Sequence, residues 1–176
     1  MFRTPFSTWD PQWSETEHEV FRDFGHAAFL AQMLESALIT VLLAMEDAGH
    51  IQFKKKNDIE SEPFLSKKTL GQLFCELRRA GFDGELEALL KDAVEARNFL
   101  MHHFFVWPSS EDYVSGEGRG RMLKELQQLR FRIGRAQVAF SQIREQIVEK
   151  VYGISRETLA KLYEDYRREQ HDGEQE

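Results

Sequence analysis

Residues 20–45, VFRDFGHAAFLAQMLESALITVLLAM, decide the fold, because their apolar residues recur at alternating spacings of four and three. This period places the apolar residues on one face of a long helix. The residues of that face are Val20, Phe24, Ala27, Ala31, Leu34, Leu38, Val41 and Met45. Ser14 and Glu17 form a capping-box pair that predicts the start of this helix, and Gly49 predicts its end. A second apolar row, which predicts burial on two sides, consists of Leu30, Met33 and Ala37.

Downstream of this helix the sequence predicts a polar connection over residues 50–65 and then a short helix. Ser66 or Thr69 is the expected N-cap of the short helix, because both side chains can accept a hydrogen bond from the first turn. Gly81 is its expected end.

Two more helices follow, and the first contains one charged residue, Arg97, in its apolar row. This helix is predicted between Asp83 and Pro108, with the row Leu86, Leu90, Ala93, Arg97, Leu100 and Phe104. A loop over residues 108–120 leads to the last long helix, which Gly153 ends. Its unbroken run of heptad positions is Met122, Leu126, Leu129, Ile133, Ala136, Phe140, Ile143 and Ile147.

Four main helices without a convincing strand period predict an all-α fold. The expected architecture is a four-helix up-and-down type bundle with a short extra C-terminal helix, capped by Ser155. The predicted domains are an N-terminal arm over 1–14, the bundle over 15–153, and a C-terminal helix with a frayed tail over 154–176.

Composition predicts a soluble, cytoplasmic chain that is not associated with a membrane. The 176 residues are 41% apolar and 30% charged, which is typical of a globular domain. The longest nearly apolar run, Ala37 to Met45, has nine residues, whereas a membrane-spanning helix needs about 20. The single cysteine, Cys75, excludes an internal disulfide and a multi-cysteine zinc site. We expect no metal and no cofactor, since only Glu15 and His18 have the Glu-x-x-His spacing of a di-iron bundle.

Net charge limits the classes of partner. The formal net charge of −7 argues against strong nonspecific binding of nucleic acid. The distribution is uneven, because residues 117–154 contain eight basic and four acidic residues.

Candidate functional residues lie around Arg97, because an arginine in an apolar row is costly unless it is paired or reaches a cleft. Asn98 and His102 are four residues apart and share a helix face, and Glu95 lies seven residues before His102. Arg97 and His102 are five residues apart, which is about 140° around a regular helix. Both can therefore reach one atom only through long side chains, local distortion or a second copy of the chain.

The run Arg97-Asn98-Phe-Leu-Met-His102 resembles the signature of the HEPN superfamily (higher eukaryotes and prokaryotes nucleotide-binding domains). That signature is an arginine, usually followed by a polar residue such as asparagine, and then a histidine after four to six intervening residues. His103 fits the same signature with five intervening residues. The resemblance implies a HEPN-like helical bundle that acts as a metal-independent RNA endonuclease, usually as a homodimer with a composite cleft.

The resemblance also implies roles for individual residues. His102 would be the general acid or base, Arg97 would stabilise charge on the scissile phosphate, and Asn98 would orient the phosphate or the imidazole. His103 and Glu95 are further candidates. The family context implies a toxin or a stress and defence function, with a protein antitoxin or regulator as a partner.

Structural roles remain open for the same residues. Arg97 could form an ion pair inside the bundle with Glu35, Glu46 or Glu95. His102 could be a core or helix-C-terminal histidine, and His103 could pack in the aromatic cluster that follows it.

Two further alternatives concern RNA and regulation. Arg130, Arg132 and Arg135 are expected on the solvent side of the last long helix, either as a solvated face or as an RNA-binding flank. The whole protein could also be a non-catalytic helical regulator that binds a nucleotide or a protein through the same cleft.

Overall fold

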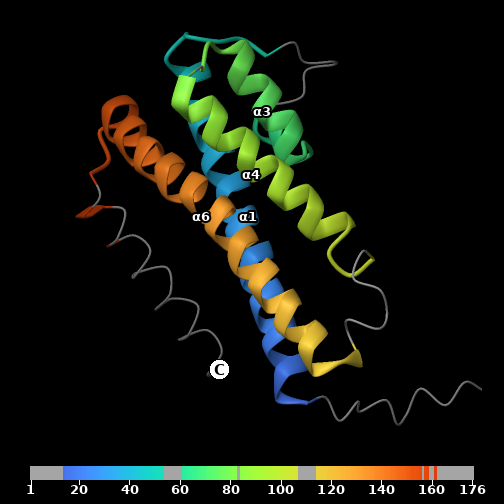
Figure 1. The fold of residues 1–176 in the computed structure, drawn as a ribbon. Helices are drawn as coiled ribbons and strands as arrows, with labels where there is room; N and C mark the ends of the chain where they lie inside the picture. The colour runs from blue at the N-terminus through green and yellow to red at the C-terminus, as the bar shows by residue number, and fades with distance from the viewer. Residues whose placement is uncertain are drawn as a thin grey trace, which may run out of the picture.

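The computed structural model describes residues 14–53, 61–82, 84–106, 114–155, 157, 158 and 161. Its main helices are α1 (Glu15–Asp47), α2 (Ser61–Ser66), α3 (Leu70–Arg79), α4 (Gly84–His102) and α6 (Gly116–Tyr152), shown in Figure 1. The described residues contain no strand, so the predicted all-α helical bundle is confirmed. Residues 1–13 of the predicted N-terminal arm, Asp83, Pro108 and most of the C-terminal helix lie outside the described residues.

The ends of the helices follow the capping signals of the sequence. The backbone N–H of Ser14 donates to Glu17 Oε2 at 2.7 Å, which is half of the predicted capping box. Of the two caps considered for α3, Thr69 is the one used: its Oγ1 accepts from the Gln72 N–H at 3.4 Å. Gly153 ends α6 with φ of 67°, a left-handed conformation that glycine adopts without strain.

The connection predicted over residues 50–65 is more structured than expected, because α2 forms at its end, from Ser61 to Ser66. The Glu46 carboxylate on α1 accepts hydrogen bonds from the Phe53 N–H at 3.5 Å and from the Ser61 hydroxyl, which starts α2. Leu65 of α2 is fully buried in the core. A helix of six residues is too short to show a helical period in the sequence.

The two longest helices, α1 and α6, are parallel and are joined near both of their ends. Arg119 Nε donates to Thr16 Oγ1 at 3.0 Å near their N-terminal ends, and Tyr152 donates to Asp47 near their C-terminal ends. The two residues of each pair are separated by nearly the same number of positions in the sequence. Two helices that run in the same direction require this. Figure 1 shows both helices running in one direction, from blue to cyan and from yellow to red.

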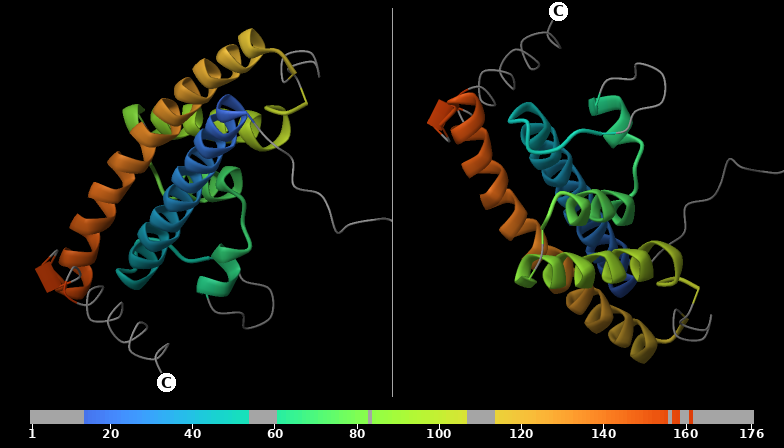
Figure 2. Two further views of the ribbon diagram at one scale, coloured as in Figure 1. Left: turned by 90° about the horizontal axis from the view of Figure 1, so that it is seen from below. Right: turned by 90° about the horizontal axis from the view of Figure 1, so that it is seen from above.

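The shorter helices α3 and α4 lie side by side, and both pack against α1 (Figure 2). Gly71 of α3 faces Val94 of α4, and Arg78 pairs with Glu87, so these two helices are antiparallel. The antiparallel α3 and α4 fit the predicted up-and-down type of bundle, whereas the parallel α1 and α6 do not, because the first and last helices of such a four-helix bundle are antiparallel.

The core consists of two clusters of buried residues, and α1 contributes to both. The first cluster joins α1 to α2, α3, α4 and the C-terminal half of α6. The second cluster joins the N-terminal halves of α1 and α6 to the C-terminal half of α4. Six of the eight residues predicted on the apolar face of α1 are buried, and Phe24 and Met45 are half-buried.

Among the described helices, only α1 is long and apolar enough by composition to cross a membrane. An 18-residue window of α1 has a mean hydropathy of 1.8, and 39% of that window is buried inside the fold. Core helices of soluble proteins have the same property. The apolar composition of α1 fits its place between the two core clusters.

The burial pattern of the core predicts that two phenylalanines of α6 contribute very differently to the free energy of unfolding. Phe140 is 1% exposed and packs against Phe82, whereas Phe131 is 65% exposed. We expect Phe140→Ala to lower the free energy of unfolding by about 3–5 kcal/mol, and Phe131→Ala to change it by about 0.5 kcal/mol or less. Urea denaturation followed by circular dichroism measures both values. Equal losses would contradict the described orientation of α6.

The contact between Tyr152 and Asp47 predicts a loss of stability at alkaline pH. Burial and the hydrogen bond to Asp47 raise the pKa of Tyr152 to about 12. The folded state therefore holds this proton more tightly than the unfolded state. The resulting stabilisation is complete below pH 10, the ordinary pKa of tyrosine, and is lost as the pH rises through about 12. Tyr152→Phe should remove this pH-dependent part of the stability. Absorbance titration measures the pKa of the tyrosine, and denaturation across the same pH range measures the free energy of unfolding.

Candidate functional site

The candidate site is built around an ion pair between Arg97 of α4 and Glu35 of α1. Arg97 Nη2 lies 3.3 Å from Glu35 Oε1, and the two side chains are 19% and 25% exposed. The neighbouring Ala96 is fully buried and takes the inner position on α4. Arg97 therefore lies at the boundary between core and solvent, where its charge is paired and its guanidinium stays partly accessible.

Of the three carboxylates considered as partners of Arg97, the structure pairs it with Glu35. Glu46 instead holds the segment that leads into α2. Glu95 is mostly exposed and lies 3.8 Å from Arg132 on α6. Glu35 is the only Asp, Glu, Lys or Arg between residues 24 and 45, so this ion pair also satisfies the one charge in the apolar part of α1.

Arg97 has a second contact within α4. Its Nη1 donates to Asn98 Oδ1 at 3.4 Å, a long hydrogen bond between neighbouring residues. A guanidinium carries five N–H donors in a planar fork, so these two contacts leave donors that can bind an oxyanion. Asn98 is exposed, which makes its amide accessible as well.

His102 is the last residue of α4, and both His102 and His103 are exposed. Their ring centroids are 6.4 Å apart, and the ring of His103 lies 6.1 Å from that of Phe99. Neither is a core histidine. His102 is instead at the helix C-terminus, one of the two structural positions considered for it.

The chain turns sharply after α4 and places apolar side chains next to the histidines. The N–H groups of His103 and Phe104 both donate to the Phe99 carbonyl, at 2.8 and 2.9 Å. Phe104 is thereby buried against Phe24. Exposed apolar side chains of this region are Met101, Phe105 and Val106, with exposures of 48%, 43% and 78%.

Arg97 and His102 do not converge within one chain. The α4 helix is regular from Gly84 to His102, so their five-residue separation corresponds to about 140° around its axis. No hydrogen bond joins these two side chains in the part of the chain that the structure describes. One copy of the protein thus brings Arg97, Asn98 and Glu35 together and leaves His102 pointing to another side of the helix.

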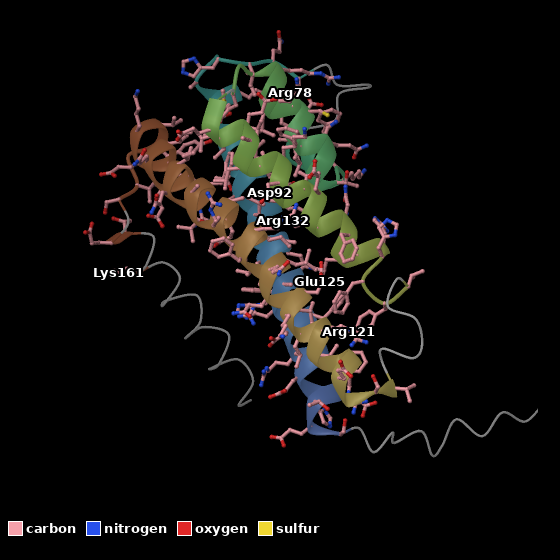
Figure 3. All side chains as sticks on the ribbon, in the orientation of Figure 1. Arg78, Asp92, Arg121, Glu125, Arg132 and Lys161 are labelled. Atoms are coloured by element: carbon pink, nitrogen blue, oxygen red, sulfur yellow. The ribbon has the colours of Figure 1, made fainter. Side chains whose placement is uncertain are left out.

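Two of the three arginines expected on the solvent side of α6 pair with other helices, whereas Arg135 is exposed. Arg130 pairs with Asp23 of α1 at 3.2 Å, and Arg132 pairs with Asp92 of α4 at 2.7 Å, as Figure 3 shows for the second pair. Arg135 lies over the ring of its neighbour Phe131, 5.6 Å from the ring centroid. Their RNA contact stays a prediction, but Arg130 and Arg132 already have a structural role between helices.

The acidic partners Asp23 and Asp92 were not predicted from the sequence. Neither lies in a motif, and helical spacing identifies neighbours on one helix but not the partners on another. Across the described ranges, no group of three or more His, Cys, Asp or Glu side chains is placed to hold a metal ion.

Comparison with known proteins found no similar protein. No family model matches the chain, and neither does any curated protein or any solved structure. The arguments about function therefore rest on the residues and their geometry.

The ion pair predicts energetic coupling between α1 and α4. In a double-mutant cycle with Arg97→Ala and Glu35→Ala, we expect a coupling free energy of about 1 kcal/mol, because both side chains are half-buried. The matched control is the exposed pair of Arg121 (labelled in Figure 3) and Glu117 on α6, at 58% and 90% exposure. That control should give about 0.3 kcal/mol. Urea denaturation of all variants provides the values, and equal coupling in the two cycles would contradict a half-buried bridge.

Proposed function

We propose that this protein is a HEPN-like, metal-independent RNA endonuclease that acts as a homodimer. The observation that carries the proposal is the arrangement of the last turns of α4. There a half-buried arginine is held by a carboxylate from another helix, and the accessible Asn98 and His102 follow it. This set combines an oxyanion-binding fork with an imidazole that can transfer protons.

The chemistry follows from the residue types. Cleavage by the ribose 2′-OH requires removal of its proton, stabilisation of charge on the phosphate, and protonation of the leaving 5′-oxygen. Arg97 would bind the phosphate through guanidinium N–H groups that Glu35 and Asn98 do not use. His102 would transfer protons, with His103 as the neighbouring alternative, and Asn98 would orient the phosphate or the imidazole.

A second copy of the chain resolves the divergence of Arg97 and His102. A two-fold axis near the end of α4 would bring the His102 of one protomer toward the Arg97 of the other. The exposed Met101, Phe105 and Val106 beside His102 support this placement, because a second protomer would cover them. Basic side chains of α6 would supplement phosphate binding, and in the family context a protein antitoxin would restrain the nuclease.

The alternative is a non-catalytic regulator in which Arg97 anchors an anionic ligand. The separation of Arg97 and His102 around α4 favours this alternative, because an anion bound by Arg97 needs no histidine beside it. The two functions differ in what they require of His102. The nuclease needs its imidazole, whereas the regulator needs only the guanidinium of Arg97.

The test is cleavage of a mixed RNA pool in excess EDTA by the wild type and three variants. We expect the wild type to leave 2′,3′-cyclic phosphate ends, and Arg97→Ala and His102→Ala to reduce the rate by about 100-fold or more. His26→Ala, which removes an exposed histidine of α1, is the matched control and should retain full activity. Circular dichroism and sedimentation confirm that each variant is folded and has the same oligomeric state.

The outcomes separate the two functions. Cleavage that is lost in both Arg97→Ala and His102→Ala, with the fold intact, supports the nuclease. A folded wild type that cleaves none of the pool, and whose binding of a nucleotide is weakened by Arg97→Ala but not by His102→Ala, supports the regulator and contradicts the nuclease.

A further inference from the structure

A cavity of about 670 Å³ lies between residues 50–53, α2 and α3, and neither Arg97 nor His102 lines it. Its volume is within the range of roughly 300–1,000 Å³ that is typical of small-molecule sites. Part of its lining is aromatic, with Phe53 and Phe64, and another part is charged, with Lys68, Glu76 and Arg79.

The charged wall has an excess of positive charge. Glu76 is 13% exposed, and its carboxylate is shared by Lys68 at 3.0 Å and Arg79 at 3.2 Å. Two cations therefore share one carboxylate. Lys68 and Glu76 are mostly buried at 18% and 13% exposure, so an unpaired charge on Lys68 is more costly there than on the open surface. His50 also lines the cavity and adds a group that can donate a hydrogen bond.

The aromatic wall adjoins the cations. The ring centroids of Phe53 and Phe64 are 5.9 Å apart, and Lys68 Nζ lies 4.3 Å from the centroid of Phe64. A flat ring entering the cavity can stack on these phenylalanines while an attached anion reaches Lys68 and Arg79.

Contacts from α1 fix the position of the aromatic wall. Glu46 accepts hydrogen bonds from the Phe53 N–H and the Ser61 hydroxyl, and these contacts fix the segment after α1 and the start of α2. The two aromatic side chains also pack against the first core cluster. The cavity is thus formed by positioned elements, which lowers the entropic cost of binding.

From these contacts we propose that the α2–α3 cavity binds a small organic anion that carries a planar ring. The anion pairs with Lys68 and Arg79, and the ring stacks against Phe53 and Phe64. This site is independent of the proposed nuclease centre, since no residue is shared between them.

Isothermal titration calorimetry on the full chain tests the proposal with four probes. AMP and anthranilate each combine a planar ring with an anion, as a nucleotide and as an aromatic carboxylate. Adenosine supplies a ring without the anion, and inorganic phosphate supplies an anion without the ring. We expect AMP or anthranilate to bind with a Kd below about 1 mM. We also expect its affinity to exceed that of adenosine and of phosphate by about tenfold each.

Adjacent residues supply matched variants. Lys68→Met and Arg79→Gln should each weaken binding by about tenfold, because each removes a charged partner of the anion. Lys67→Met and Arg78→Gln are the controls: neither residue lines the cavity, and Arg78, labelled in Figure 3, pairs with Glu87. Arg79 is 74% exposed, so Arg79→Gln keeps the test valid if Lys68→Met impairs folding.

Each outcome decides the proposal. Tighter binding of AMP assigns the site to nucleotides, and tighter binding of anthranilate assigns it to aromatic acids. If neither binds the folded wild type, or if binding is unchanged by both Lys68→Met and Arg79→Gln, the cavity is not such a site.

Discussion

The contact between α1 and α6 is the constraint on which the rest of the structure depends. Both helices run in the same direction, and contacts near both ends, from Thr16 with Arg119 to Asp47 with Tyr152, keep one register. The apolar stripe of α1 contributes to two core clusters, and these hold α3 and α4 against it. Ion pairs join α1 and α6 to α4. These ion pairs fix the position of α4 and therefore of the candidate site in its last turns.

Much of the fold could be predicted from the sequence because its long helices have unbroken apolar periods. The predicted faces of α1 and α6 are largely the buried ones, and Thr69 and Gly153 act as the helix ends that their residue types suggest. The helix α2 was missed because six residues give no period. The parallel direction of α1 and α6 could not be predicted, because an apolar stripe shows which face is buried but not the direction of the neighbouring helix.

Less of the candidate site could be predicted, because it depends on contacts between helices. The position of Arg97 in an apolar row left open whether it is paired or reaches a cleft, and Glu35, its partner in the structure, was one of three possible partners. The arginines of α6 were expected to face solvent, but Arg130 and Arg132 reach carboxylates on α1 and α4. The α2–α3 cavity could not be predicted from the sequence, because its walls are formed by short segments without a helical period. The catalytic roles remain proposals, since one chain does not bring Arg97 and His102 together.

We propose that Arg97 and His102 act from different protomers, and a mixture of two inactive variants distinguishes this arrangement from a site within one chain. Arg97→Ala and His102→Ala proteins would be unfolded together, refolded as heterodimers, and assayed for RNA cleavage in EDTA. Because a mixed dimer still pairs one intact arginine with one intact histidine across the two-fold axis, the account predicts that cleavage returns. If heterodimers form and remain inactive under conditions in which the wild type cleaves, the composite site is contradicted.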